Sequence, residues 1–258
     1  MTQTPRIEIN GVSPTAELLR AVADSSYGHF TAMQVRGRRV RGLELHLARL
    51  AAANREVFGA ALDTGAVCDH IRHALGGDTP DASVRVYVLE LLDRPSVMVT
   101  VRPPGGMREG PWKLQPVPYQ RPVAHIKHAS DFGQGYYQRL AHRNGFDEAL
   151  LTGPGGVISE GSSTNIGFSD GAAVTWPDAP ALAGITMQLL SRQLPGVGLT
   201  SRRERVTVAD VSRFAAAFVT NARGIAAVRQ IGDRAVPVDA RLMKTLADAY
   251  ESAGWDAL

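Results

Sequence analysis

The sequence is poor in lysine and cysteine and has no long apolar run. Only Lys113, Lys127 and Lys244 are lysines among its 28 basic residues, and the rest are arginines. The single cysteine, Cys68, cannot form an internal disulfide, and no Cys/His cluster has metal-ligand spacing, so we expect no metal site. No apolar stretch approaches the roughly 18 residues that span a bilayer, and the first residues lack the apolar region of a signal peptide. We therefore expect a reducing, cytoplasmic setting and no contact with membranes.

The overall composition is that of a globular protein. The 258 residues are 44% hydrophobic and 21% charged, which excludes disorder as the main state. The net charge of +3 comes from arginines spread along the chain, which are densest in VRGRRVRG (Val35 to Gly42) and SRRERV (Ser201 to Val206). Either stretch could face an anionic partner such as nucleic acid, but a solvated strand or turn is the simpler interpretation, and we favour it.

The order of predicted elements indicates two domains of mixed α and β structure. A strand pair around Arg36-Gly37-Arg38, a helix that ends at Gly59, a second helix and two further strands predict a smaller N-terminal α+β domain at residues 1–109. The Pro- and Gly-rich residues 110–122 predict an interdomain loop. A helix that ends at Gly145, several strands and two later helices predict a larger C-terminal domain at residues 123–258.

Two charged residues stand in unusual surroundings. Lys127, in HIKHAS, is either a surface cation or an amine with altered reactivity, and for a lysine taken at random the surface interpretation is favoured. Glu160, in GVISEGSSTN, is either on an edge strand or buried beside a cationic or protonated partner, because an unpaired buried carboxylate is costly. Neither residue alone indicates a function.

Two further motifs are weak signals of anion binding. Gly184-Ile185-Thr186 stands where a helix is predicted to begin, and the free N–H groups of a helix N-terminus can hold a phosphate, although ordinary capping is the simpler interpretation. Thr220-Asn221 ends a predicted strand, where hydroxyl and amide groups complete either a phosphate site or an ordinary turn.

Taken together and in this order, these motifs resemble the class IV aminotransferase family of fold type IV pyridoxal-phosphate enzymes. That family includes branched-chain aminotransferases, D-amino-acid aminotransferases and aminodeoxychorismate lyases. The matching motifs are HLARL with His46 and Arg49, Lys127, DEAL at residues 147–150, Glu160-Gly161 followed by Thr164-Asn165, Gly184-Ile185-Thr186, and Thr220-Asn221. They extend over residues 27–230.

The resemblance implies a cofactor, pyridoxal 5'-phosphate (PLP), and a role for each motif. Lys127 would form a Schiff base with the cofactor and, once freed, move a proton between substrate and cofactor. Glu160 would keep the pyridine nitrogen protonated. The phosphate would be bound by a set of residues from three motifs: Arg49, Ile185, Thr186, Thr220 and, less strongly, Asn221.

The positions that the family uses for substrate choice differ here. Phe30 stands where an aromatic residue of the pocket, often tyrosine, is expected, and Phe132 stands at the tyrosine position of the Gly-Gly-Asn-Tyr found after the lysine of branched-chain enzymes. We expect both phenylalanines to contact the substrate. The Arg-x-His pair that binds the substrate carboxylate in D-amino-acid aminotransferases is missing, and Arg94 and Arg102 are the nearest arginines.

The sequence thus predicts a PLP-dependent transaminase that moves an amino group from a D-amino acid to a 2-oxo acid and extends to (R)-primary amines. By resemblance it would act as a homodimer, with no nucleic-acid partner. The first alternative is an aminodeoxychorismate lyase that releases pyruvate, because the lyase and the transaminase share their first steps. The second is a non-catalytic binding protein on the same fold, with VRGRRVRG as a nucleic-acid face.

Overall fold

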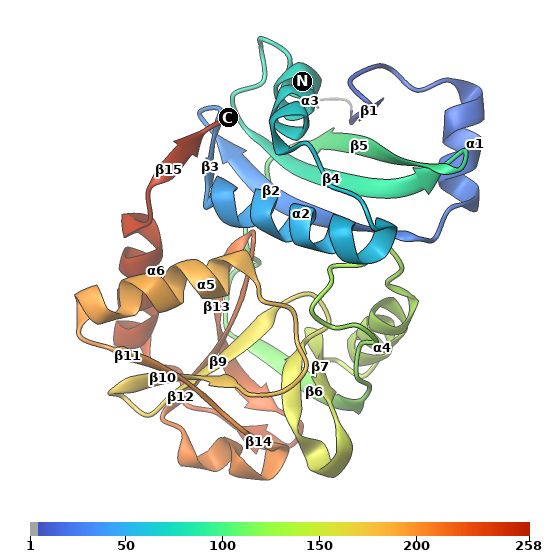
Figure 1. The fold of residues 1–258 in the computed structure, drawn as a ribbon. Helices are drawn as coiled ribbons and strands as arrows, with labels where there is room; N and C mark the ends of the chain where they lie inside the picture. Colours follow the sequence, from blue (N-terminus) through green and yellow to red (C-terminus); the bar gives the residue numbers. More distant parts are fainter. Residues whose placement is uncertain (1–4) are drawn as a thin grey trace. The chain divides into compact units, whose positions relative to one another are not determined.

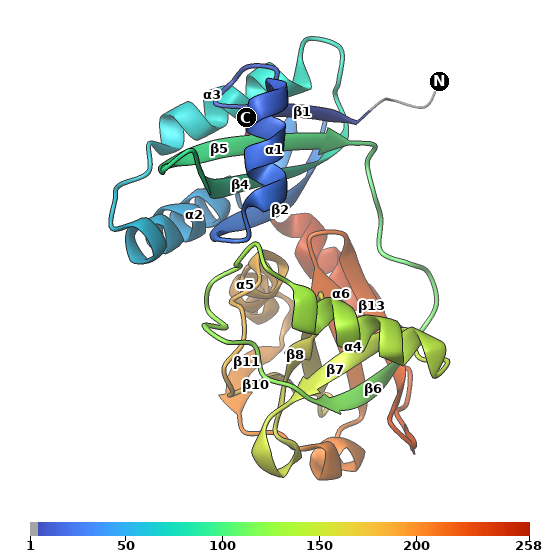
Figure 2. The same cartoon turned by 90° about the vertical axis from the view of Figure 1, so that its right-hand side faces the viewer.

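The computed structural model describes residues 5–258, which form two compact units. The first comprises residues up to Gly105 together with Ile126–Ser130 and Gly254–Leu258, and the second comprises Gly106–His125 and Asp131–Ala253. Figures 1 and 2 show the elements of both. No helix within residues 5–258 is long and apolar enough to cross a membrane.

The first unit is a six-stranded sheet with three helices. Its elements are β1 (Arg6–Ile9), α1 (Ala16–Asp24), β2 (Gly28–Arg36), β3 (Arg39–Arg41), α2 (Leu43–Phe58), α3 (Thr64–Leu75), β4 (Ala82–Leu91), β5 (Arg94–Arg102) and β15 (Trp255–Ala257). All pairs in the strand order β1-β5-β4-β2-β3-β15 are antiparallel.

Alternation along the strands gives this sheet two different faces. Met33, Val84, Val86 and Val99 on one face pack with apolar residues of α2 and α3 into the main core. The other face carries Phe30 and its neighbours, and α1 covers one end of it, where Leu18, Ala21 and Val22 pack on Ile9, Leu89 and Met98. Figure 2 shows α1 lying across this second face, away from α2 and α3. The rest of the second face is half-buried and partly polar.

The second unit is a nine-stranded, curled sheet with three helices and three short 3-10 turns. Its strands are β6 (Trp112–Pro118), β7 (Glu148–Thr152), β8 (Ile158–Gly161), β9 (Asn165–Ser169), β10 (Ala173–Pro177), β11 (Thr200–Glu204), β12 (Ala216–Asn221), β13 (Gly224–Ile231) and β14 (Arg234–Ala235). Its helices are α4 (Phe132–Arg143), α5 (Ile185–Gln193) and α6 (Ala240–Ser252), and its 3-10 turns are η1 (Pro154–Gly156), η2 (Leu194–Val197) and η3 (Val208–Arg213). The strand order is β11-β10-β9-β12-β13-β6-β7-β8, with β14 beside β13.

Helices cover this sheet on its outer side, while strand side chains fill the inside of the curl. Helices α5 and α6 pack on Val174, Trp176 and Phe218 of β10 and β12. Helix α4 packs on β6 and β7 through Ala141. The inner cluster is formed mainly by strand residues, among them Leu114, Leu150, Phe168 and Val228. The mixed α/β architecture is the one that the sequence predicted, and the structure adds that the sheet of the second unit curls into a half-barrel.

Residues 110–122, expected to be an interdomain loop, instead contain strand β6 in the interior of the sheet. The prolines misled the prediction, because a central strand rarely contains them. Here β13 pairs with β6 only at Trp112, Lys113 and Leu114, and Gly232 N–H donates to the Leu114 carbonyl at that end. Pro116 and Pro118 share the alternation of Leu114, so their missing N–H groups point to the side where β13 has already ended.

Two short segments belong to a different unit from the one expected. Residues 126–130, placed in the C-terminal domain from the sequence, pack with the first unit, and so does the end of the chain through β15. The physical reason for the first difference is backbone pairing: Phe30 N–H donates to the Lys127 carbonyl at 2.8 Å, and Ala129 N–H donates to the Gly28 carbonyl at 2.8 Å. Backbone pairing of this kind cannot be predicted from local composition.

Candidate active site

Lys127 lies beside strand β2 and extends the sheet of the first unit. An antiparallel bridge pairs His29 with His128, which places Lys127 directly opposite Phe30 and on the same face of the sheet. On the other side of β2, Gly28 allows the close approach of β4. Its φ is +148°, and a Cβ there would lie 2.3 Å from the Val88 carbonyl oxygen. The backbone hydrogen bonds from Phe30 to Lys127 and from Ala129 to Gly28 therefore tie the segment that carries the lysine to β2.

The Lys127 amine rests on an aromatic ring. Its Nζ lies 4.7 Å from the centroid of the Phe30 ring, and that ring stacks on Tyr87 with centroids 5.0 Å apart and planes 20° from parallel. A cation over a ring face is attracted by the ring quadrupole, and the stack limits the motion of Phe30. The structure thus brings together Lys127 and Phe30, two of the residues that the sequence singled out.

A buried triad from β2 and α2 lies behind this pair. The Thr31 hydroxyl oxygen accepts a hydrogen bond from Arg49 Nη2 at 2.6 Å and lies 2.7 Å from His46 Nδ1. Burial lowers the pKa of His46 well below its ordinary value, and the charges of Arg49 and Lys127 lower it further. His46 is therefore neutral at pH 7, and the HLARL motif provides the ring and the guanidinium that surround Thr31.

In the second unit Glu160 is buried at the end of β8 in an ion pair that the sequence did not predict. Its Oε1 accepts a hydrogen bond from Arg121 Nη1 at 3.0 Å, and its Oε2 accepts one from the Leu182 N–H at 3.1 Å. Both charged side chains are almost fully buried. Arg121 also donates to the Ala124 carbonyl. Nothing in the sequence around Arg121 marks it as this partner, because the two residues are 39 positions apart.

The N-terminus of α5 lies against the ends of β9 and β12. Asn165 Nδ2 donates to the Leu182 carbonyl at 2.7 Å, and Thr186 Oγ1 donates to the Asn221 carbonyl at 2.8 Å. Gly184 packs so closely on Asn165 that a Cβ there would lie 1.9 Å from its Oδ1. The first N–H groups of the helix, at Ile185 and Thr186, have no partner within the helix.

Next to this helix end lies a buried hydroxyl without a hydrogen bond. Thr220 is paired with Asn165 across β12 and β9 and is fully buried, and its Oγ1 has no partner. A buried polar atom of this kind is rare in a native protein and requires an explanation. Asn221 is already occupied, since its Oδ1 accepts a hydrogen bond from Arg223 N–H. Helix N–H groups and a free hydroxyl form a surface suited to an anion.

Glu148, from the DEAL motif, fixes the loop between β8 and β9. It accepts hydrogen bonds from the hydroxyls of Ser162, Ser163 and Thr164 and from the Ser163 N–H. Burial raises its pKa, and these hydrogen bonds lower it in part. This hydrogen-bonded loop separates β8 from β9.

The remaining predicted residue lies on the surface of its unit. Phe132 is the first residue of α4 and is 82% exposed, and its ring stacks on Tyr136 at 6.4 Å. Phe30, Arg49 and Lys127 thus belong to the first unit. The second unit contains the other predicted residues: Phe132, Glu160, Ile185, Thr186, Thr220 and Asn221. Within residues 5–258 no group of three or more His, Cys, Asp or Glu side chains could bind a metal ion.

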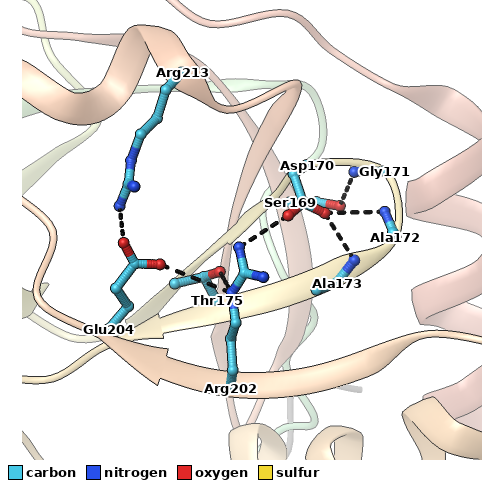
Figure 3. A network of polar contacts seen from close by, with 9 residues as sticks. All are labelled: Ser169, Asp170, Gly171, Ala172, Ala173, Thr175, Arg202, Glu204 and Arg213. Atoms are coloured by element: carbon cyan, nitrogen blue, oxygen red, sulfur yellow. Dashed lines mark hydrogen bonds and ion pairs between the residues drawn. The ribbon is translucent and has the colours of Figure 1, made fainter.

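Several arginines of the two basic stretches are bound within the protein. Arg202 pairs with Asp170 at 2.9 Å, and Glu204 of the same stretch pairs at 2.6 Å with Arg213, which lies outside both stretches, as Figure 3 shows. The N–H groups of Ala173 and Ala172, followed by Arg202, lower the pKa of Asp170. In VRGRRVRG, Arg38 donates to the Gly76 carbonyl and Arg39 to the Trp255 carbonyl. These contacts favour structural roles over a nucleic-acid face.

Comparison with known families identifies the chain. The sequence model of the family "Amino-transferase class IV" matches residues 28–231. The chain belongs to this family. A search of curated protein sequences found no match.

Solved structures of aminotransferases have the same fold. A hypothetical aminotransferase from Mycobacterium tuberculosis, in its PLP-bound form, is 19% identical with a TM-score of 0.84, covering 97% of this chain and 98% of that one. A branched-chain aminotransferase from Thermoproteus uzoniensis with norvaline is 17% identical with a TM-score of 0.84, covering 95% and 93%. A candidate 4-amino-4-deoxychorismate lyase from Legionella pneumophila is 16% identical with a TM-score of 0.81, covering 90% and 93%. At these identities the likeness shows the fold, which is fold type IV.

Proposed function

We propose that this class IV aminotransferase uses PLP to transfer an amino group from a D-amino acid, or from an (R)-primary amine, to a 2-oxo acid. The observation that carries the proposal is the Lys127 amine, which the pairing of residues 127–129 with β2 holds 4.7 Å from the Phe30 ring. A flexible surface lysine would have neither the paired backbone nor the aromatic support. The M. tuberculosis protein has also been solved with α-ketoglutarate and PMP, which supports a 2-oxo acid as the acceptor.

The residues present fit PLP. The partnerless Thr220 hydroxyl and the N-terminus of α5 offer donors to its phosphate. The buried carboxylate of Glu160 already accepts hydrogen bonds from Arg121 and from the Leu182 N–H, and a pyridine N–H would have to use a remaining lone pair of one of its oxygens. When bound, PLP supplies an electron sink that makes the proton on the substrate's α-carbon acidic.

Each predicted site residue would then have a defined role. Lys127 would supply the amine that holds the aldehyde group of PLP, and the same amine, once free, would remove the proton from the substrate's α-carbon. An arginine could not replace it, because a guanidinium stays protonated. Glu160 would hold the proton on the pyridine nitrogen, while Arg121 and the Leu182 N–H fix the carboxylate. Arg49, with the Ile185 and Thr186 N–H groups and the Thr220 hydroxyl, would bind the phosphate, whereas the Thr186 hydroxyl already donates to the Asn221 carbonyl.

The test combines absorbance with chemical trapping. The protein loaded with PLP should absorb in the visible region, and reduction with borohydride should add a pyridoxyl-phosphate group to the peptide that contains Lys127. D-Alanine, D-glutamate, (R)-1-phenylethylamine and L-leucine are then added separately. Loss of the visible band with the D-amino acids supports the proposal, whereas attachment at Lys113 or Lys244, or full turnover by Lys127→Ala, would refute it.

The lyase is the second candidate, because the Legionella protein shares the fold over 90% of this chain. It would use the same Lys127 to remove the α-proton and would then release pyruvate. Pyruvate formed from aminodeoxychorismate without an added 2-oxo acid would favour the lyase over the transaminase. The homodimer and the cytoplasmic location expected from the sequence remain predictions.

A further inference from the structure

The second face of the sheet in the first unit carries an arginine with most of its hydrogen-bonding capacity unused. Arg85 is half-buried on β4. Within residues 5–258 its guanidinium makes one hydrogen bond, from Nη1 to the Tyr87 hydroxyl at 3.1 Å, and no ion pair. A guanidinium has five N–H donors, so one hydrogen bond uses only a small part of the donor capacity of Arg85. Arg85 therefore lacks the kind of partner that a ligand could supply.

The position of Arg85 relates it directly to the reactive lysine. Its Cζ lies 5.8 Å from the centroid of the Phe30 ring, and Lys127 Nζ lies 4.7 Å from the same centroid. Strand register places all three on one face of the sheet, because Phe30 lies opposite both Tyr87 and Lys127, and Arg85 precedes Tyr87 by two residues. One aromatic ring thus lies next to both cationic groups.

Arg85 has small neighbours on the adjacent strands, and Tyr87 orients its guanidinium. On the neighbouring strands the residues opposite Arg85 are small, Ala32 on β2 and Thr100 on β5. The Tyr87 ring stacks on Phe30, so its hydroxyl holds Arg85 Nη1 from a fixed point. By contrast, Arg36 on the same face is already bonded to Gln34 and to the carbonyls of Val35 and Gly105.

We propose that Arg85 binds a carboxylate of the amino donor or of the 2-oxo acid, and so makes the enzyme prefer carboxylate-bearing substrates to simple amines. The proposal rests on the transaminase function argued above. A planar guanidinium can donate two parallel hydrogen bonds to a carboxylate, which gives both affinity and a fixed orientation. The substrate's α-carbon would then lie near the Lys127 amine that removes its proton, while its carboxylate is held by Arg85 and Phe30 lies beneath the atoms between them. This arrangement provides the carboxylate contact that the missing Arg-x-His motif would otherwise supply.

The decisive comparison uses Arg85→Gln and Arg85→Lys, with Arg102→Gln as the matched control. Arg102 is an exposed arginine on β5 of the same sheet. The measured quantities are kcat and KM of the PLP-loaded enzymes for D-alanine, D-glutamate and (R)-1-phenylethylamine. Arg85→Gln should raise KM for the amino acids by about 10- to 100-fold, the effect of losing a hydrogen-bonded charge, and should change KM for the amine by less than about threefold. Arg85→Lys should recover part of the loss, and Arg102→Gln should match the wild type.

The two amino acids separate the possible sources of the carboxylate. A loss with both D-alanine and D-glutamate assigns Arg85 to the α-carboxylate, whereas a loss with D-glutamate alone assigns it to the distal carboxylate. Equal effects on the amine and the amino acids, or no effect on any of them, would overturn the proposal.

A binding measurement keeps this test independent of turnover. Calorimetry with propanoate and glutarate on the PLP-loaded protein should give a dissociation constant that rises at least tenfold in Arg85→Gln and is unchanged in Arg102→Gln. If no donor is turned over by any variant, the proposed function fails, and this measurement still decides whether Arg85 binds carboxylates. Equal affinity in wild type and Arg85→Gln would refute the role of Arg85 while leaving transamination intact.

Discussion

Arg121 and Glu160 form an ion pair with both side chains buried, and Nη1 lies 3.0 Å from Oε1. Removing one partner from such a pair leaves an uncompensated charge, which costs more than the pair itself contributes. Arg121→Met should therefore lower the free energy of unfolding of the cofactor-free protein by about 3–5 kcal/mol, measured by urea denaturation. The double variant Arg121→Met/Glu160→Gln should recover part of this loss. A single variant as stable as the wild type would contradict the role of the pair.

Thr220→Val should stabilise the cofactor-free protein but weaken the binding of PLP. Valine has the shape of threonine but no hydroxyl, so it removes a buried group that lacks a partner. The cofactor-free protein should gain about 1–2 kcal/mol of stability, while the dissociation constant of PLP should rise. Thr186→Val is the matched control. Its hydroxyl donates to the Asn221 carbonyl, so this variant should lose stability. If Thr220→Val destabilises the empty protein, the hydroxyl is not an unused donor.

Gly184→Ala tests how closely α5 approaches β9. The backbone at Gly184 has φ −64°, which alanine adopts without strain, so the effect would come from the Cβ, which would lie 1.9 Å from Asn165 Oδ1. We expect the start of α5 to shift, with weaker PLP binding measured by equilibrium dialysis and a loss of about 1–3 kcal/mol in stability. Gly196→Ala, where a Cβ meets nothing within 4 Å, should change neither quantity.

Gly161→Ala should disturb the loop that Glu148 holds. A Cβ at Gly161 would lie 2.3 Å from Thr164 Oγ1 and 2.7 Å from Glu148 Oε2. The expected cost is about 1–3 kcal/mol in urea denaturation. In a Glu148→Ala background one of the two clashing groups is gone, so the added cost of Gly161→Ala should be smaller. Strict additivity of the two substitutions would show that the alanine does not meet Glu148.

Because His29 is buried as a neutral ring, we expect the protein to lose stability in mild acid. Burial lowers the pKa of His29 from 6.5 to about 4. Between these two pH values the His29 ring is therefore mostly protonated in the unfolded chain and mostly neutral in the folded chain. The stability contributed by the neutral ring is complete above about pH 6.5 and is lost as the pH falls toward 4. Relative to His29→Gln, the wild type should lose at most about 3 kcal/mol between pH 7 and pH 4, measured as the difference in free energy of unfolding. A difference that stays constant over this range would mean that His29 does not titrate as inferred.

The parts that the sequence could predict are those with local signals. Lys127 and the Gly184 helix start are marked by motif order, and α2, which contains HLARL and ends at Gly59, is marked by both motif order and periodicity. Arg121, β6 and the Ser162–Thr164 loop depend on partners far along the chain. The Arg121–Glu160 pair joins two segments 39 residues apart, and β6 lies between β13 and β7 despite its prolines. Neither hydrophobic spacing nor turn composition contains this information.

Because lysines are few and Lys127 lies over Phe30, the contact between this amine and the ring can be observed as an NMR chemical shift. Protons above an aromatic ring are shielded by its circulating electrons, so the ε-methylene signal of Lys127 should move upfield in a spectrum of the protein labelled only at lysine. Lys113 lies farther from its ring, with Nζ 5.8 Å from the centroid of Phe146, and Lys244 pairs with Asp248 on the surface. An ε-methylene signal upfield of the other two lysine signals would thus report the contact of Lys127 with Phe30 in solution. Bonding of this amine to an aldehyde would move that signal alone.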